Sequence, residues 1–316
     1  MLVRTLKTRL KHVVNRPPSK TPAKAPSKRG VFSIGIYSGK SPFELVPLDN
    51  VANPVLTREH VSDVDAALVA DPFMINIDRL WYMFFEVLSR ESNKGNIALA
   101  ISDNGLEWDY QQIILTEHFH LSYPYVFEWQ SEYYMVPECY ETDSVRLYKA
   151  ADFPRKWSFV GAILKGTDYV DPSIFRFDNR WWLFVGHGTP PERADILRLY
   201  YADGLMGPWL EHPESPIIEG DTRRARPAGR VLVFNDKVIR YAQDCYPVYG
   251  TQVRAFEITE LSRTTYRERE VVEKNPVLTA SGIGWNNSGM HHIDGHLMHD
   301  GRWLACVDGR GFNPRK

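Results

Sequence analysis

Cysteine is scarce in this sequence, and long apolar runs are missing. Cys139, Cys245 and Cys306 are the only cysteines among 316 residues, and none forms a CxxC pair. An odd, widely spaced set is neither a disulfide framework nor a structural zinc site. No run of about 18 apolar residues occurs, as a membrane-spanning helix would require, and no secretory signal is recognisable at the N-terminus. We therefore expect a cytoplasmic protein with reduced thiols.

Acidic side chains are absent from the first 29 residues, which carry nine Lys or Arg. The remainder then holds 29 basic and 39 acidic side chains, and this acidic balance argues against nucleic-acid binding. Residues 1–15 would place an apolar stripe on a basic helix. Such a helix could contact a partner or lie peripherally at the inner face of a membrane, and a solvated tail is the other interpretation. Residues 16–29 have the composition of a linker. We expect a basic flexible arm over 1–29 and one folded domain over 30–316.

A repeat with a period near fifty residues is the strongest pattern in the chain. Each copy has a polar marker residue, often a proline, a short apolar strand, a tight turn and an aromatic-rich strand. The markers are spaced by 52, 48, 55 and 68 residues, and they are Asp71, Tyr123, Asp171, Arg226 and Asp294. The turns contain the Asn, Asp and Gly residues that two-strand hairpins need.

Five such repeats predict an all-β, five-bladed β-propeller, because sheets of this kind bury both faces when they pack radially. The last repeat stops after about two strands, whereas residues 32–57 contain strand-like runs that belong to no other repeat. We expect these N-terminal strands to complete the fifth blade and close the ring. A two-sheet sandwich is the rival fold, and the regular period favours the ring.

The markers stand at the start of the first strand of each repeat, and the first strands of a propeller line its central channel. We therefore expect Asp71, Tyr123, Asp171, Arg226 and either His292 or Asp294 to meet at one mouth of the channel. Proline next to a marker is tolerated because the first residue of a strand needs no ladder donor. The plain alternative is that these polar residues only satisfy loop amides.

The Asp-Pro starts of the first and third repeats resemble the five-bladed propellers of the glycoside hydrolase family 43 superfamily. In that superfamily the aspartates corresponding to Asp71 and Asp171 act as base and as orienting residue. The motifs IGIYSGKSPF, VADPFM, RPAGRV, YAQDC and SGMHHIDG further resemble the N-terminal domain of glucosamine inositolphosphorylceramide transferase-like proteins, over roughly residues 31–310. In plant members this domain precedes a separate glycosyltransferase domain, so the resemblance implies a role with sugars rather than one reaction.

These motifs complete the predicted site. The predicted catalytic carboxylates are Asp71, Asp171 and Asp244. The predicted substrate-binding residues are Tyr37, Ser41, Tyr123, Arg226, Gln243, His291, His292 and Asp294. One departure from the hydrolase pattern stands out, because family 43 enzymes place a general-acid Glu in the fourth blade. The fourth repeat here begins Arg-Pro, and Asp244 would replace that Glu only if its strand delivers it to the pocket.

Cations favour glycosyl transfer over hydrolysis. Guanidinium groups bind phosphate bidentately, and a phosphate leaving group needs positive charge rather than a proton donor. Four arginines cluster near the fourth marker: Arg223, Arg224, Arg226 and Arg230. We therefore expect transfer from a phosphate-activated sugar to a glycan or lipid-linked acceptor in polysaccharide or glycoconjugate biosynthesis, with Asp71 as the base.

Two other functions remain open. One is a glycoside hydrolase of the family 43 type, with Asp71 as base and Asp171 or Asp244 in the second role. The other is a propeller that binds glycan or protein without catalysis. His292, Asp294 and His296 share one face of a strand, as a divalent-ion site would require, but histidines also line sugar pockets as hydrogen-bond partners. We expect no metal and no cofactor.

Overall fold

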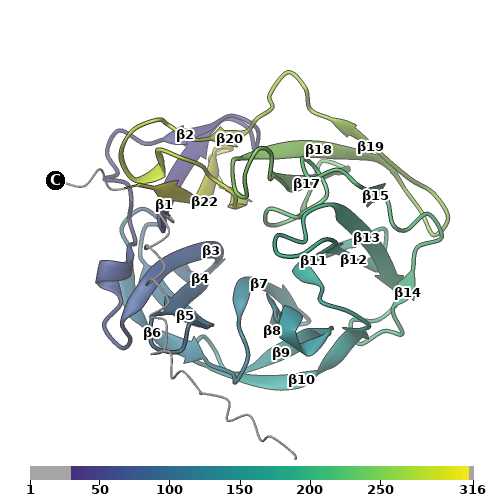
Figure 1. Cartoon of the computed structure of the whole chain (residues 1–316), viewed down its shortest axis with the longest axis horizontal. Coiled ribbons are helices and arrows are strands. Elements are labelled where there is room, and N and C mark those ends of the chain that lie inside the picture. The colour runs from purple at the N-terminus through teal and green to yellow at the C-terminus, as the bar shows by residue number, and fades with distance from the viewer. Residues whose placement is uncertain (1–29, 313–316) are drawn as a thin grey trace, which may run out of the picture.

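The computed structural model describes residues 30–312, which form five antiparallel sheets arranged around one axis (Figure 1). The predicted five-bladed β-propeller is confirmed. In each sheet the first strand of the repeat lies nearest the axis. Helical structure within these residues is limited to the short 3-10 turns η1 (Arg58–His60), η2 (Tyr140–Thr142) and η3 (Gly284–Asn286). No helix among them is long and apolar enough to span a bilayer. The predicted arm over 1–29 lies outside the described residues.

Four blades are built from strands that are consecutive in the chain. Blade one holds β3 (Ala66–Ile77), β4 (Leu80–Ser89), β5 (Gly95–Ser102) and β6 (Asp109–Leu115). Blade two holds β7 (Ser122–Trp129), β8 (Glu132–Glu138), β9 (Ser144–Asp152) and β10 (Lys156–Lys165). Blade three holds β11 (Val170–Phe177), β12 (Arg180–His187), β13 (Ile196–Ala202), β14 (Leu210–Glu211) and β15 (Ile218–Glu219). Blade four holds β16 (Leu232–Phe234), β17 (Lys237–Asp244), β18 (Gln252–Leu261), β19 (Tyr266–Glu270) and β20 (Leu278–Thr279).

The fifth blade joins the two ends of the domain, as predicted. Its inner strands are β21 (Ile293–Leu297) and β22 (Trp303–Gly311), and its outer strands are β1 (Val31–Gly39) and β2 (Leu45–Pro47). β1 pairs with β22 along its whole length, from Val31 opposite Gly311 to Gly39 opposite Trp303. Closure therefore rests on a full antiparallel ladder.

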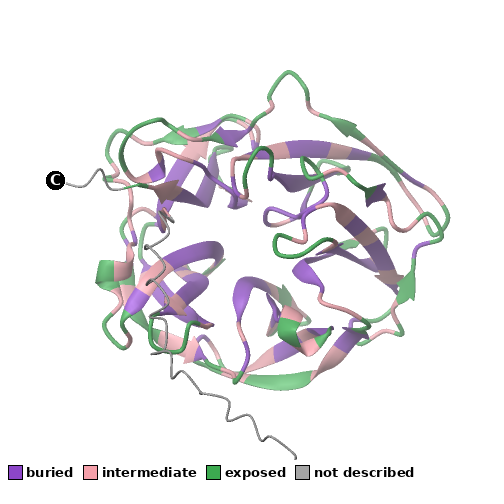
Figure 2. Cartoon of the chain, in the orientation of Figure 1, coloured by how far each residue is buried: buried purple, intermediate pink, exposed green. Residues whose placement is uncertain are grey.

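Aromatic side chains of the second strands hold neighbouring blades together. Trp181 of β12 packs on Phe127 and Trp129 of blade two, at ring-centroid distances of 5.6 and 5.2 Å. Phe84 of β4 packs edge-on against Trp157 of β10, at 5.6 Å. Buried residues follow the inner strands of the ring, while exposed residues gather on the outer strands and loops (Figure 2). These aromatic side chains form the core between neighbouring blades, and the polar side chains near the axis are not part of it.

Three inner strands carry the same distortion near their start. The pairing register shifts between Ala70 and Phe73 in β3, and at the equivalent places in β7 and β11. Within each bulge one residue adopts a left-handed backbone: Asp71, Tyr123 and Asp171, with φ of 52°, 46° and 48°. A proline follows each of them and needs no ladder hydrogen bond. A bulge re-aims a side chain, so the repeated motif turns one residue per blade away from the regular pleat.

Candidate functional site

Carboxyl groups from different blades meet at one mouth of the channel. The bulges of β3 and β11 bring Asp71 and Asp171 there. The ends of the second strands add further polar groups at matching positions: Glu86, Glu138, Gln243 and Asp308. Arg226 and His291 supply positive charge from the segments that precede β16 and β21. All of these side chains are buried or nearly so.

Asp171 is held by a network that fixes its orientation. Arg226 donates to it through Nε at 2.5 Å, and Gln243 Nε2 donates at 2.9 Å. The backbone N–H of Asp171 donates to Glu138 Oε2 at 2.9 Å, and Arg226 Nη2 lies 3.4 Å from the same oxygen. Burial raises the pKa of Asp171 to about 7, against the opposing effect of Arg226. Arg226 and Gln243 were predicted to bind substrate, and in the structure both donate hydrogen bonds to the Asp171 carboxylate.

Asp71 is held differently, because no arginine within residues 30–312 pairs with its carboxylate. Its backbone N–H donates to Asp308 Oδ2 at 3.1 Å, while its Oδ1 faces His291 Nε2 at 3.8 Å and His292 Nδ1 at 3.9 Å. Burial raises the pKa of Asp71 to about 7; the His291 charge opposes this rise, and Asp308 and Asp171 add to it. A carboxyl with a pKa near neutrality suits general acid–base work.

The two histidines beside Asp71 have pKa values shifted in opposite directions. His291 Nδ1 lies 2.7 Å from Asp308 Oδ1, and although burial lowers its pKa, the carboxylates around it bring a net rise. His292 Nε2 lies 3.0 Å from the carbonyl oxygen of Pro72, which only accepts, so this nitrogen carries the proton. Burial lowers the pKa of His292 to about 4. Its buried Nδ1 is therefore an unpartnered acceptor that faces Asp71.

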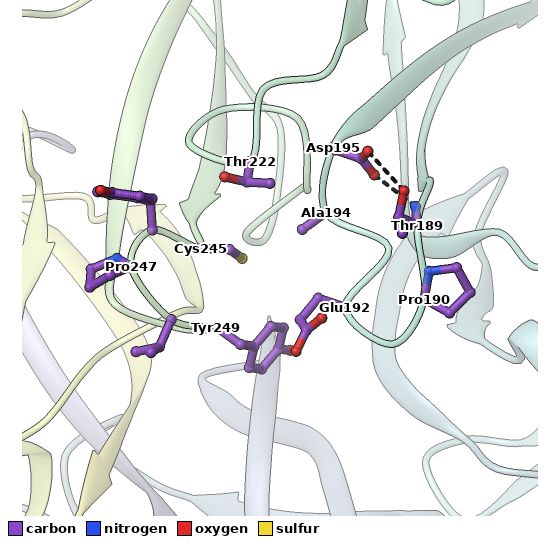
Figure 3. Close-up of a pocket in the computed structure, with 11 residues that line it drawn as sticks. Thr189, Pro190, Glu192, Ala194, Asp195, Thr222, Cys245, Pro247 and Tyr249 are labelled. Atoms are coloured by element: carbon purple, nitrogen blue, oxygen red, sulfur yellow. Dashed lines mark hydrogen bonds between the residues drawn. The ribbon is translucent and has the colours of Figure 1, made fainter.

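A pocket of about 440 Å³ is present at blades three and four, and Figure 3 shows the residues that line it. It lies between the loop after β12 and the loop after β17. Its lining includes Thr189, Glu192, Asp195, Thr222, Tyr246 and Tyr249. Arg226 joins the pocket to the acids, since its Nη1 donates to the Glu192 carbonyl and its guanidinium lies 5.1 Å from the centre of the Tyr249 ring. A sugar bound in the pocket would have an aromatic ring and carboxyl groups within reach.

Asp244 does not join the site, so its predicted catalytic role is wrong. Successive side chains of a strand point to opposite faces, and in β17 Gln243 is the residue that faces Asp171. Asp244 instead accepts hydrogen bonds from Gln252 Nε2 at 2.9 Å and Arg254 Nε at 2.8 Å. Its carboxylate is buried on the other side of the blade and stabilises the neighbouring strand.

Tyr123 and Asp294 lie deeper in the channel, and their predicted contact with substrate does not fit the structure. The Tyr123 side chain is fully buried, and its hydroxyl accepts from Gly229 N at 2.6 Å and lies 2.8 Å from Ser173 Oγ. Asp294 accepts from Arg230 Nε at 2.6 Å and from Met74 N at 2.7 Å. Both residues hold the blades to one another.

Tyr37 and Ser41 lie on β1 and in the turn that follows it, and neither reaches the acids. The hydroxyl of Tyr37 accepts from Asn286 Nδ2 at 3.1 Å inside the fifth blade. Ser41 follows the end of β1 that pairs with Trp303, whereas the mouth lies at the other end of β22, near Asp308. The predicted substrate contacts of these two residues are therefore not supported by their positions.

Glu86, Glu138, Asp308 and Tyr249 belong to the site but do not follow from the marker residues. Glu86 and Glu138 each come fifteen residues after a marker, Asp71 and Tyr123, at the end of the second strand. Pairing places that position beside the bulge, with Glu86 opposite Ala70 and Glu138 opposite Ser122. This shared offset of fifteen residues is the sequence signal that points to Glu86 and Glu138.

One carboxylate–histidine group has the spacing of a cation site. The possible ligand atoms of Asp71, His291 and Asp308 lie within 4.8 Å of one another. Asp308 Oδ1, however, already accepts from His291 N, His291 Nδ1 and His292 N, and its Oδ2 accepts from Asp71 N. A cation would have to displace these bonds, so we assign none here, and the absence of a metal stays a prediction.

The fold and the site together define a five-bladed propeller with a cluster of buried carboxyl groups at one mouth of its channel. Residues 25–310 match the family described as glucosamine inositolphosphorylceramide transferase 1, N-terminal, and the chain belongs to this family, as its motifs predict. The rice protein (Oryza sativa subsp. japonica) named glucosamine inositolphosphorylceramide transferase 1 is 34% identical over 313 residues, covering 93% of this chain and 42% of the relative. Its Arabidopsis thaliana counterpart is 33% identical over 298 residues, covering 89% and 39%. The chain thus spans less than half the length of these relatives.

Solved structures of similar fold are glycoside hydrolases. The catalytic domain of a Coprinopsis cinerea family 62 α-L-arabinofuranosidase superposes with a TM-score of 0.57 at 13% identity, covering 90% of this chain and 98% of that one. A Cellvibrio cellulosa α-L-arabinanase gives 0.57 at 14%, covering 78% and 93%. A Clostridium thermocellum exo-β-1,3-galactanase gives 0.56 at 13%, covering 68% and 51%. At these identities the likeness shows the fold alone.

Proposed function

We propose that this chain transfers a glycosyl group to an acceptor hydroxyl at the mouth of its channel, with Asp71 as the general base. The observation that carries this proposal is the setting of the Asp71 carboxyl. Burial raises its pKa to about 7, and its Oδ1 faces two histidine nitrogens at 3.8 and 3.9 Å. One of these histidines, His291, packs on Tyr249 of the pocket, with 5.2 Å between the ring centres. A hydroxyl oxygen placed between the carboxyl and these histidines would give its proton to Asp71 while His291 donates to the same oxygen or its neighbour.

Asp171 supports this role as an orienting group. Its fixed carboxylate, held by Arg226 and Gln243, would accept a hydrogen bond from a ring hydroxyl of the sugar and so set the position of the reacting carbon. Tyr249 and Tyr246 would contact the apolar face of a sugar ring in the pocket. The name of the plant relatives fits an acceptor hydroxyl on a glycan or a lipid-linked glycan, and we propose that class, in the cytoplasm or at the inner face of a membrane.

The donor is a glycoside in our first proposal, because the clustered arginines are occupied. Arg226 pairs with Asp171 and Glu138, Arg230 with Asp294, and Arg224 with Asp221. Paired guanidinium groups would have to give up carboxylates before they bound a phosphate. A phosphate-activated sugar is the second candidate, and Arg223 supports it, since this residue stacks at 4.4 Å over Tyr246 at the rim of the pocket.

Product analysis with both donor classes tests the proposal. The chain is incubated with an acceptor glycan and either aryl glycosides or sugar nucleotides, and products are identified by mass spectrometry. We expect a transfer product that Asp71→Asn reduces by about 10² to 10⁴-fold, while Asp49→Asn, a matched change at an exposed aspartate, leaves the rate unchanged. A chain that binds glycan with equal affinity before and after Asp71→Asn, and forms no product from either donor, is a binding module instead.

A further inference from the structure

The mouth lacks an assigned proton donor, and we infer that Glu86 is that donor, with His120 as the residue that positions it. This inference rests on the proposed function. A glycoside donor needs an acid at its leaving oxygen as well as a base at the acceptor. The propeller hydrolases that the sequence resembles place this acid in the fourth blade, where the present chain has Gln243. Glu86 lies in blade one, and we infer that its carboxyl takes the place of the general acid that the fourth blade lacks.

Glu86 and Asp71 are the most exposed acids of this buried cluster. It lies in β4 opposite Ala70, so it adjoins Asp71 across the same hairpin. The side chains of Glu86 and Asp71 are each 10% exposed. The other carboxyls of the cluster are less exposed, namely Glu138 at 6%, Asp171 at 2% and Asp308 at 0%. The two carboxyls that a ligand reaches most readily are thus the base and Glu86.

The partner of Glu86 leaves one carboxyl oxygen free. Within residues 30–312 no arginine or lysine pairs with Glu86, and its polar neighbour is His120 Nε2, 3.4 Å from Oε1. His120 Nδ1 accepts from Gly95 N at 3.0 Å, and burial lowers the His120 pKa, so the neutral ring carries its proton on Nε2. His120 Nε2 thus faces Oε1 without a well-formed hydrogen bond, and Oε2 has no hydrogen-bond partner within residues 30–312.

The local backbone is shaped around this pair. A Cβ added to Gly95 would lie 2.8 Å from Glu86 Oε1 and 2.1 Å from the Leu121 carbonyl oxygen. Only glycine leaves room for the glutamate and the histidine to meet there. Gly95 of β5 and the segment just before β7, His120 and Leu121, thus surround the Glu86 carboxyl.

The charges around Glu86 favour its protonated form. Burial raises its pKa well above the ordinary range, and four nearby carboxyls add to the rise: Asp71, Glu138, Asp308 and Asp171. The remaining titratable neighbour, His120, is neutral and so does not oppose the rise. Glu86 differs in this from Asp171, whose carboxylate is paired with Arg226. A carboxyl that keeps its proton at neutral pH is the acid that a glycosidic leaving group requires.

The two carboxyls then complete one balanced transfer. The Glu86 proton passes to the glycosidic oxygen as the bond from the anomeric carbon to that oxygen breaks, and the bonding electron pair leaves with the oxygen as a neutral alcohol. The acceptor oxygen forms the new bond to the anomeric carbon with its own lone pair, and its proton passes to the Asp71 carboxylate. Glu86 ends ionised and Asp71 protonated, and exchange with water restores both.

Leaving-group dependence tests this assignment. Rates of Glu86→Gln and the unmodified chain are compared on glycosides with an alkyl leaving group and with a dinitrophenyl leaving group, which departs without a proton. We expect a loss of about 10² to 10³-fold on the alkyl glycoside, little loss on the dinitrophenyl glycoside, and disappearance of the alkaline limb of the pH profile. Glu91→Gln, an exposed glutamate in the loop after β4, is the matched control and keeps full activity.

The outcomes separate this inference from the proposed function. If the unmodified chain transfers no glycoside at all, the proposed function fails and the role of Glu86 fails with it. If the chain is active and Glu86→Gln keeps its rate on alkyl glycosides, only the role of Glu86 is overturned. An infrared spectrum at neutral pH gives an independent readout, since loss of a protonated-carboxyl band in Glu86→Gln supports the assignment and an unchanged spectrum contradicts it. In His120→Ala we expect the alkaline limb of the pH–rate profile to shift rather than disappear.

Discussion

At the scale of single residues, the site combines groups that hold the fold with groups that are left free to react. Asp171 and Asp71 occupy equivalent bulges, yet one is paired with Arg226 and the other has no arginine partner. Left-handed backbone at non-glycine residues costs on the order of 1–3 kcal/mol and persists where the surroundings demand it. The same strained turn thus holds a carboxylate against an arginine in blade three, and in blade one it holds a carboxylate that pairs with no arginine of the described residues.

Arg226 is expected to be a large contributor to stability because it neutralises two buried acids. In Arg226→Met, Asp171 and Glu138 lose their cation, and removal of one partner of a buried ion pair costs about 3–5 kcal/mol. We expect a lower free energy of unfolding by urea denaturation at pH 8 and a smaller loss at pH 5, where protonation relieves the unpaired Asp171.

The matched control for Arg226 is an exposed pair. Arg302 and Asp300 are both exposed, and such pairs contribute roughly 0–1 kcal/mol. Arg302→Met should therefore leave the free energy of unfolding nearly unchanged. Equal effects of the two substitutions would show that the buried network does not stabilise the ring.

The sequence predicted the site residues that follow the repeat and missed those that depend on strand facing. Asp71, Asp171 and Arg226 recur at the repeat period, so their convergence follows from the ring. Gln243 and Asp244 are neighbours on one strand, and only pairing decides which of them faces the axis. In the sequence, Glu86 is one polar residue in an apolar strand. Its place beside Asp71 depends on the bulge in the opposite strand.

At the scale of the strand, closure of the ring by β1 is the feature most open to test. Ile36 is fully buried in the middle of β1, opposite Cys306 of β22, whereas Val46 of β2 is 61% exposed. Truncation of a buried isoleucine to alanine costs about 2–5 kcal/mol. We expect Ile36→Ala to lower the free energy of unfolding by that amount in urea denaturation, while Val46→Ala changes it little.

The shape of the transition adds a second test of closure. A ring closed by β1 should unfold as one unit, so Ile36→Ala should shift the midpoint of a single transition. An early separate transition in the variant, with the rest of the chain unaffected, would mean that the fifth blade is stable on its own.

The sequence predicted hairpins and blades well because turn residues and aromatic alternation are local signals. It predicted a short apolar first strand in each repeat, and in the fourth repeat this strand, β16, covers only Leu232–Phe234. The segment before it approaches blade five, where a Cβ on Gly229 would lie 1.8 Å from the Ile293 carbonyl oxygen. Such a close approach between neighbouring blades is a tertiary effect that the local pattern does not contain.

At the scale of the whole molecule, the crowded acids make stability depend on pH. Asp71 and Asp171 have folded-state pKa values of about 7, and the pKa values of Glu86 and His291 are also raised. A raised pKa means that the folded state holds its proton more tightly, so this stability is present at low pH and is lost as pH rises through the folded value. His292 and His120 oppose this trend only below their ordinary value of 6.5.

We therefore expect the melting temperature to fall as pH rises from about 6.5 to about 8.5. Differential scanning calorimetry across this range checks the slope. Asp71→Asn cannot ionise and should reduce the slope, so that the variant is more stable than the unmodified chain at the alkaline end. A melting temperature that rises over the same range would contradict the raised pKa values of the cluster.

The ion pair between Arg230 and Asp294 stands across the axis below the mouth. Arg230 also donates to the carbonyl oxygens of Met74 and Val126, so inner strands of three blades are tied at this level. We therefore expect this level of the axis to be closed to a threaded polymer, so that a ligand would enter and leave at the mouth above it.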